Sequence, residues 1–575
     1  MSAINDILSG IMKPGRYIGS EWNVSRKDFA SAGVKFAICF PDLYEVGMSN
    51  LGIRILYAIL NNIPDVACER LFSPGIDLES SLRSNKREIF SLESRRGLKE
   101  FDIAGFSLGN ELGYTNILAI LDLAGIPFSS RERGSGYPLI IGGGPCTLNP
   151  EPLHDFFDLF IIGEAEEAIV ELVNAFRPLK DGFKNGSIGK KELLAKLASI
   201  EGVYVPSLYD VECGPQPPVK IKKRIISDLD SAYFPVNWLV PFIQIVHDRI
   251  SIELMRGCHN KCRFCQARQQ YYPCRVRSPE KILAAAKEAF RRSGYEEIAL
   301  TGLSVSDYPH IEKVLSSFMD EFKEKCVALS LPSIKPNKEV GGMSTLIASF
   351  KKTGLTFAPE AATEKMRAVL GKDFNMQEFM QAIEEAFASG YLHVKLYFMI
   401  GLPFETEADL DGIIGLAETI SGLGKKIRRR PAQVNVAVNA LIPKPHTCFQ
   451  WFSMPLPSEI EAKQKYLRQK ASRHKWLKLN FHDCRMSFLE AVFSRGDRRL
   501  SRVILNAYNA GARFDAWQEH FKFEVWQAAF NDCGIDPEVY LKEKPVDSIL
   551  PWDFLEAGPG KDALLTEFNK IIDIK

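Results

Sequence analysis

Three cysteines lie within eight residues near the middle of the chain, in the pattern C-x3-C-x2-C. They are Cys258, Cys262 and Cys265, and they follow a strand-like run, Ile250–Met255. Thiolates are soft ligands that suit iron–sulfur clusters or zinc. Three thiolates can hold a cubane [4Fe–4S] cluster and leave one iron without a protein ligand. A substrate or cofactor can coordinate that iron, so the pattern predicts a chemically open metal site.

A zinc site is the alternative for the same cysteines. Cys274 or His259 could then supply the fourth ligand. Structural zinc usually pairs its ligands in two short C-x2–4-C knuckles, and no second knuckle lies nearby in the sequence. The spacing therefore favours the iron–sulfur cluster.

Phe264, directly before the third cysteine, completes a motif that resembles the radical S-adenosylmethionine (SAM) superfamily. The resemblance implies that SAM chelates the open iron and that electron transfer from the reduced cluster cleaves it to methionine and a 5′-deoxyadenosyl radical. That radical would take a hydrogen atom from the substrate. The resemblance also implies an external electron donor of the flavodoxin or ferredoxin type.

The elements that must position this loop alternate between strands and helices. From about 34 to 175, buried strand patterns alternate with amphipathic helix patterns, which predicts a flavodoxin-like doubly wound parallel sheet. Six further strand candidates alternate with helices and predict an incomplete TIM-like (β/α)6 barrel, with chemistry at the carboxyl ends of its strands. These candidates are Ile250–Met255, Glu297–Gly302, Val327–Leu331, Leu355–Ala358, His393–Ile400 and Val434–Leu441.

We predict four regions and an α/β fold overall. Residues 1–180 form a cobalamin-binding-like α/β domain, 181–240 a linker with some strand pairing, 241–455 the radical SAM core, and 456–575 a mainly helical C-terminal region. The cysteine loop follows the first strand of the core, where the barrel rule places reactive groups.

The resemblance extends to later strand ends, where it implies contacts with SAM. Glu360 lies in Pro359-Glu360-Ala361-Ala362, which resembles a segment of radical SAM enzymes that carry cobalamin domains or perform methylthiolation; a cap on the next helix is the alternative. Gly302, Ser330, Gly401 and Pro403 are the other candidates. Each also has a simple structural explanation: Gly302 as a turn glycine, Ser330 as a solvated loop serine, and Gly401 with Pro403 as the end of a buried strand.

The first module resembles the cobalamin-binding domain found before some radical SAM barrels. The matching late strand ends contain Gly142, Gly143, Gly144, Gly163 and Glu164, and glycines there let a large ligand approach the backbone. Tyr44 occupies the position of the cobalt-ligating histidine in the segment Asp42–Gly47. A phenol is a poor cobalt ligand at neutral pH. A bound cobalamin would lack a histidine ligand from this loop, and a degenerate domain that kept only its fold is the alternative.

The composition of the chain indicates its protein class and the cellular compartment in which we expect it. The 575 residues are 46% hydrophobic and 25% charged with a net charge of +1, which is typical of a globular protein and predicts no global attraction to nucleic acid or lipid. The sequence contains no membrane-spanning run, and its N-terminus lacks the features of a signal peptide. Twelve dispersed cysteines suit a reducing compartment, so we expect a cytoplasmic protein.

Nearly the whole chain resembles bacterial radical SAM proteins with an N-terminal cobalamin-binding-type domain, a resemblance that brings no substrate or catalytic side chain. Methyl transfer to an unactivated carbon and hydrogen-abstraction rearrangement both fit it. A tRNA-modifying enzyme resembling the methylthiotransferases is a second hypothesis, and a non-catalytic metal- or corrinoid-binding regulator is a third. Basic residues interleaved with aromatics after position 463 could contact RNA, but a solvated helix face explains them more simply.

Overall fold

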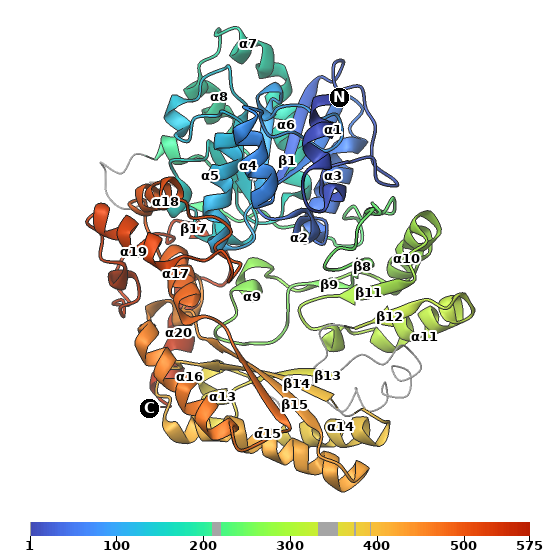
Figure 1. Ribbon diagram of the computed structural model, residues 1–575, viewed down its shortest axis with the longest axis vertical. Helices are drawn as coiled ribbons and strands as arrows, with labels where there is room; N and C mark the ends of the chain where they lie inside the picture. The colour runs from blue at the N-terminus through green and yellow to red at the C-terminus, as the bar shows by residue number, and fades with distance from the viewer. Residues whose placement is uncertain (1, 210–219, 332–354, 373–374, 392, 575) are drawn as a thin grey trace.

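The computed structural model describes residues 2–209, 220–331, 355–372, 375–391 and 393–574. Two α/β modules lie one above the other, and the C-terminal helices run along one side of both (Figure 1). Among the described helices, none combines the length and the apolar character that a membrane crossing requires.

The first module is a six-stranded sheet in the order β2-β1-β3-β4-β5-β6, parallel except for the last pair. The order β2-β1-β3-β4-β5 is that of a flavodoxin-like doubly wound sheet, as predicted. Its strands are β1 (Val34–Phe40), β2 (Val66–Phe72), β3 (Ile103–Ser107), β4 (Leu139–Gly143), β5 (Leu159–Ile161) and β6 (Val203–Tyr204). The helices of this part are α1 (Ser2–Ser9), α2 (Tyr44–Gly47), α3 (Leu51–Asn62), α4 (Ile76–Ser84), α5 (Tyr114–Leu123), α6 (Ala165–Phe176), α7 (Lys180–Lys184) and α8 (Lys190–Leu197).

The second module contains all six predicted strands. Together with β16, they form two parallel sheets, β8-β11-β12 and β13-β14-β15-β16, and within the described residues these do not close into a barrel. The strands are β8 (Ile250–Glu253), β11 (Glu297–Thr301), β12 (Ala328–Ser330), β13 (Leu355–Glu360), β14 (His393–Ile400), β15 (Gln433–Ala440) and β16 (Leu477–Phe481), with a short antiparallel pair of β9 (Met255–Arg256) and β10 (Arg275–Val276). Its helices are α9 (Gln266–Gln270), α10 (Pro279–Ser293), α11 (Ile311–Phe322), α13 (Glu364–Leu370), α14 (Met376–Ala388), α15 (Glu407–Arg428) and α16 (Pro457–Ala471).

Strand β16 was not predicted. It lies in the region expected to be mainly helical and extends the second sheet in parallel beside β15. Its residues alternate between half-buried and exposed, a weaker strand pattern than that of β14 and β15, in which every second residue is fully buried.

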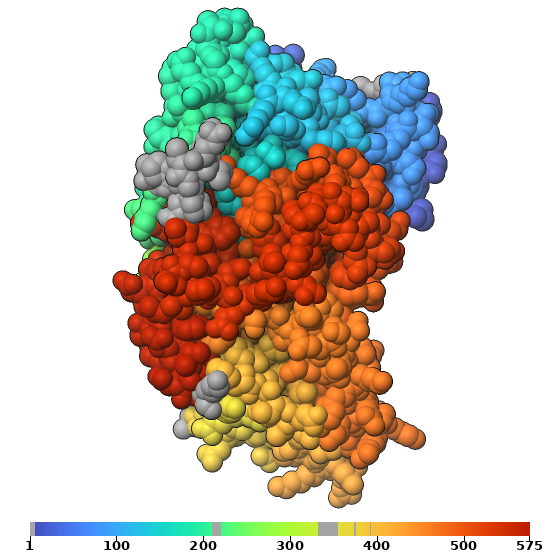
Figure 2. All heavy atoms as spheres, turned by 90° about the vertical axis from the view of Figure 1, so that its left-hand side faces the viewer, coloured from blue at the N-terminus to red at the C-terminus, as the bar shows by residue number. Residues whose placement is uncertain are grey.

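The remaining C-terminal elements join the two modules. They are α17 (Cys484–Ser494), α18 (Leu500–Asn509), α19 (Phe523–Asp532), β17 (Leu555–Glu556) and α20 (Lys561–Ile572), and β17 pairs with β7 (Ile221–Lys222) of the linker. Figure 2 shows this region spanning from the first module to the second. Buried bonds fasten it: the Thr115 hydroxyl donates to Asp515, which also accepts from the Trp526 indole.

Candidate functional site

The three cysteines of the motif occupy the loop between β9 and α9, and each is partly exposed. Gly257, which begins this loop, has φ of +89°, and a Cβ there would lie 2.6 Å from the Tyr271 carbonyl oxygen. Only glycine fits this close approach. The Arg263 N–H donates to the Leu370 carbonyl at 2.8 Å, which fastens the loop to α13.

The three thiols lie in one loop and have the donor chemistry that a cluster requires. Among the described residues, no three His, Cys, Asp or Glu side chains gather closely enough to hold one metal ion. This absence does not count against a cluster, because the cysteine ligands of a cubane bind separate iron atoms and need not surround one ion. The preference for a cluster over zinc rests on the sequence spacing. Burial raises the pKa of the Cys265 thiol, while backbone N–H groups of Arg268 and Ala267 oppose that rise.

Glu360 has an unusual backbone at the end of β13. Its φ is +64°, and the register between β13 and β14 shifts between Phe357 and Glu360. The carboxylate lies 3.7 Å from Lys372 Nζ, and burial raises its pKa while Lys372 opposes the rise. This conformation holds a half-buried carboxylate at the strand's carboxyl end, near the Lys372 ammonium.

The other predicted SAM contacts lie at neighbouring strand ends but face different surroundings. Gly302 lies close to Met255, and Gly401, with φ of +78°, packs against Ile460 of α16. Pro403 and Ser330 are half-buried, and the segment after Leu331 lies outside the described residues. Phe264 packs against an apolar cluster that includes Leu370, Cys448 and Phe449. These assignments remain predictions from the resemblance.

A cavity of about 470 Å³ lies between the two modules. Its inner part runs between the sheet and helices α3 and α6 and is apolar; its walls there are Phe36, Ile38, Ile53, Leu56, Gly105, Ile141, Ile161 and Ile169. Its mouth contains polar groups of both modules, namely Ser107, Glu164, Glu166, Glu253, Arg256, Gln270, Tyr271 and Thr301. The sheet's carboxyl edge, where ligands of doubly wound folds bind, therefore opens toward the cysteine loop.

The predicted glycines of the first module line this cavity, as do Gly302 and Glu164. A Cβ at Gly144 would lie 2.9 Å from the Leu108 carbonyl oxygen at φ of +117°, so glycine is required there. Gly143 differs, because a Cβ there would meet only the Ile161 carbonyl oxygen, at 3.9 Å. Gly142 and Gly163 are tightly packed.

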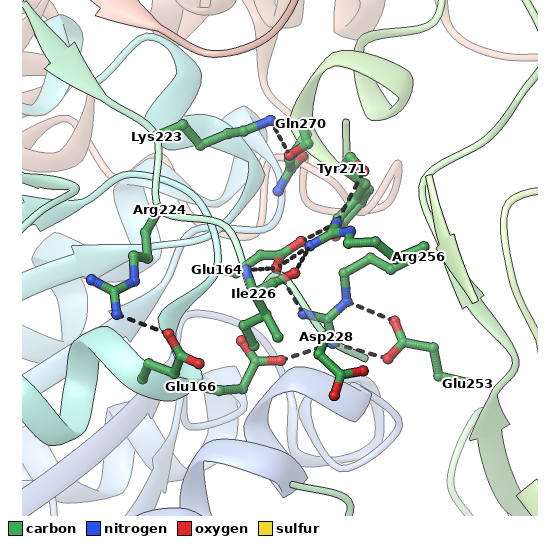
Figure 3. Close-up of polar contacts among 12 residues, drawn as sticks. Glu164, Glu166, Lys223, Arg224, Ile226, Asp228, Glu253, Arg256, Gln270 and Tyr271 are labelled. Carbon is green, nitrogen blue, oxygen red and sulfur yellow. Dashed lines mark hydrogen bonds and ion pairs between the residues drawn. The ribbon is translucent and has the colours of Figure 1, made fainter. Parts of the chain in front are cut away.

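A buried ion network crosses the mouth of the cavity (Figure 3). Glu164 accepts hydrogen bonds from Arg275 at 2.7 and 2.8 Å and from the Ile226 N–H at 2.7 Å. Arg256 contacts Glu166 and Glu253 at 2.8 and 2.9 Å. The pKa of Glu164 is lowered because the arginines outweigh its burial. Glu164, predicted as a cofactor contact, therefore joins the modules through bonds to its carboxylate.

Lys223, which our sequence analysis did not select, fastens the helix that follows the cysteine loop. Its buried ammonium donates to the carbonyls of Gln269, Gln270 and Tyr272 at 2.7, 2.8 and 3.0 Å. Figure 3 shows Lys223 pointing toward Gln270. Burial lowers its pKa to about 8. It lies in a basic stretch of the linker that resembles a solvated strand, so the sequence carried no signal of this role.

We expect Lys223→Met to impair the retention of a metal cluster. The substitution leaves three carbonyls at the end of α9 without their donor, and a buried acceptor left unpaired costs about 1–3 kcal/mol. Loss of such an outer support typically lowers metal affinity ~10–100-fold. Iron and sulfide per chain after anaerobic reconstitution and desalting measure this. Lys222→Met, on the exposed neighbour in β7, is the matched control. Equal iron retention in the two variants would refute the role.

Tyr44 lies away from the cavity. Its hydroxyl donates to Glu21 at 2.9 Å, and its ring packs edge-on against Phe72. Glu21 in turn pairs with the fully buried Arg70 at 2.8 Å. Burial raises the pKa of Tyr44. The residue at the histidine position therefore belongs to the core of the first module and does not line the cavity.

Comparison with known protein families gave matches in both modules. Residues 52–206 match the family described as radical SAM proteins, N-terminal, and residues 252–417 match the radical SAM superfamily. A relative in Methanocaldococcus jannaschii, uncharacterized protein MJ0966, is 27% identical over 88% of this chain and 98% of its own length. The threonylcarbamoyladenosine tRNA methylthiotransferase MtaB of Thermotoga maritima is 22% identical over 30% of this chain and 41% of its own.

Among solved structures, the fold is similar to that of OxsB with aqua-cobalamin bound. OxsB is described as a cobalamin-dependent S-adenosylmethionine radical enzyme. The TM-score is 0.51 at 13% sequence identity, and the match covers 94% of this chain and 80% of OxsB. The cysteine motif, the two parallel sheets of the second module and the two domain matches agree, and the chain belongs to the radical SAM superfamily, whose cofactors are a [4Fe–4S] cluster and SAM.

Proposed function

We propose that this protein is a cobalamin-dependent radical SAM enzyme that transfers a methyl group to an unactivated carbon. Cys258, Cys262 and Cys265 would hold the cluster, with SAM beside it and a corrinoid in the cavity between the modules. When bound, the cluster supplies the electron that cleaves SAM reductively. The observation that carries the proposal is the shared cavity, because it joins the cofactor edge of the first module to strand ends of the second and to Gly257, where the cysteine loop begins.

The form of the cavity supports a large amphipathic cofactor. Its inner part is lined by apolar side chains and by Gly105, which together leave a slot against the face of the sheet. Its mouth is polar and crossed by the Glu164–Arg275 pair. A corrinoid has an apolar base on its arm and amide groups around its ring, so both parts of the cavity have matching chemistry. The fold shared with OxsB, described with aqua-cobalamin bound, agrees with this assignment.

The corrinoid would bind without a protein histidine ligand from the loop after β1. Tyr44 is buried in the core of the first module, where its hydroxyl donates to Glu21. None of the described residues that line the cavity is a histidine. If a corrinoid binds here, the residues that line the cavity would hold it, and it would supply methyl-transfer chemistry.

The chain's own residues would orient SAM and exclude water. The Glu360 carboxylate, 3.7 Å from Lys372 Nζ, would accept hydrogen bonds from ribose hydroxyls. Phe264 packs against an apolar cluster, and this packing would keep water away from that side of the cysteine loop. Exclusion of water protects a reactive radical from side reactions.

We expect Glu360→Gln to weaken SAM binding ~10–100-fold, because a hydrogen bond to a charged group contributes about 1.5–3 kcal/mol. Burial raises the folded-state pKa of Glu360. SAM affinity in the parent protein should therefore fall as pH falls through that raised pKa, where the carboxylate becomes protonated. The variant should lose this dependence. Equilibrium binding of SAM to reconstituted protein between pH 5 and 8 tests both points, with the exposed Glu364→Gln as control. Unchanged affinity would show that Glu360 only shapes the strand end.

Anaerobic reconstitution with iron, sulfide and hydroxocobalamin tests the proposal as a whole. We expect a brown protein that retains stoichiometric corrinoid and cleaves SAM to 5′-deoxyadenosine with dithionite. A colourless protein with stoichiometric zinc would favour a non-catalytic metal-binding regulator. A cluster-bearing protein that cleaves SAM but retains no corrinoid would replace methyl transfer with hydrogen-abstraction chemistry.

The cysteines of the first module argue against the methylthiotransferase hypothesis. Enzymes of that type usually carry extra cluster-binding cysteines in the N-terminal domain. Here Cys39 and Cys68 are buried in different core clusters on the two faces of the sheet, and Cys146 is buried in the cluster of Cys39. Their side chains therefore do not form a second ligand set.

The partners remain proposals that follow from the chemistry. A flavodoxin- or ferredoxin-type donor in the cytoplasm would reduce the cluster, and the substrate is a small molecule or macromolecule. RNA is not favoured, because basic residues of α16 are engaged in ion pairs: Lys463 with Glu405 and Lys470 with Asp411.

A further inference from the structure

Asn260 lies inside the cysteine loop and donates twice to the first cysteine. Its backbone N–H lies 3.4 Å from Cys258 Sγ, and its side-chain Nδ2 lies 3.1 Å from the same sulfur. Nδ2 also donates to Asp307 Oδ2 at 2.6 Å. A carboxamide nitrogen carries two hydrogens, so one can point to the sulfur and the other to the carboxylate.

Asp307 comes from another part of the second module. It ends the short turn Val305–Asp307 after β11, and its N–H donates to the Ser304 carbonyl at 3.1 Å. The turn is buried at Val305 and Ser306, which holds the carboxylate in place. The aspartate therefore fixes the orientation of the amide, and the neighbouring strand end is linked to one sulfur of the site.

Hydrogen bonds to a ligand sulfur withdraw electron density from an iron–sulfur cluster and so stabilise its reduced, more negative form. A carboxylate near the cluster has the opposite effect, because its charge disfavours the added electron. We infer that Asn260 is a positioning residue that raises the midpoint potential of the cluster through Cys258, and that Asp307 orients it. This inference rests on the proposed cluster site and goes beyond it by naming what tunes the one-electron step.

The test is a redox titration of the reconstituted protein without SAM, followed by electron paramagnetic resonance of the reduced cluster. Asn260→Ala should shift the midpoint potential to more negative values and lower the rate of dithionite-driven SAM cleavage ~10–100-fold. Asp307→Asn should shift the potential to more positive values, because a charge is removed while an amide oxygen can still accept from Asn260. Asn62→Ala, at the exposed end of α3, makes the matched change far from the site and should leave the potential unchanged.

Opposite shifts in the two variants, with iron content equal to that of the parent, support the inference. Unshifted potentials in both would overturn it and leave the proposed function intact. If Asn260→Ala retains no cluster, Asp307→Asn decides alone, and an unchanged potential there overturns the inference. A parent protein that binds no cluster would overturn the proposed function and this inference together.

Discussion

Cys262→Ala is expected to abolish reductive cleavage of SAM. Removal of the central thiol leaves two protein ligands, Cys258 and Cys265, for a cluster that needs three. The loss should exceed the ~10–100-fold that follows removal of an outer partner. Production of 5′-deoxyadenosine by reconstituted protein with dithionite measures the effect, and iron content reports on the cluster itself.

The fold should survive this change, because Cys262 is a partly exposed loop residue outside the core of either module. Circular dichroism and resistance to limited proteolysis should match those of the parent. Cys326→Ala removes an exposed thiol at the end of the turn after α11 and is the matched control. Full SAM cleavage by the Cys262 variant would show that this thiol is not a cluster ligand and would remove the basis of the proposed chemistry.

Gly143→Leu is expected to prevent corrinoid binding while the cluster remains. A side chain at this position projects into the cavity at the end of β4, and the first atom it would meet lies 3.9 Å from its Cβ. The backbone is not in the left-handed region, so leucine is tolerated there. A side chain forced into a ligand's space costs about 1–3 kcal/mol or more, which lowers affinity by at least ~10–100-fold.

Absorbance of retained corrinoid after gel filtration measures this effect, and iron content confirms that the cluster site is unaffected. Gly136→Leu supplies the control, since that glycine is exposed in the same module and has nothing within 4 Å of a Cβ. The assignment of the cavity would be wrong if the Gly143 variant retained as much corrinoid as the Gly136 variant. SAM cleavage without methyl transfer by the Gly143 variant would separate the roles of the two modules.

Local patterns in the sequence determined much of this protein. The C-x3-C-x2-C spacing predicted an iron–sulfur cluster, and the alternation of strands and helices predicted both α/β modules. The family matches and the observed sheets confirmed those two predictions. They succeeded because cluster ligands close in sequence and hydrophobic periods within one element are properties of short segments.

Contacts between distant segments were decided only by the tertiary structure. Glu164 lines the cavity and stays a predicted cofactor contact, and the fold adds that its carboxylate meets Arg275, which lies 111 positions away. Lys223 lies 46 positions from the carbonyl of Gln269 that it supports, and Asn260 lies 47 from Asp307. Such pairs leave no periodic signal, because each depends on how whole sheets dock. The cavity itself has walls from two modules, so its shape exists only once both are packed together.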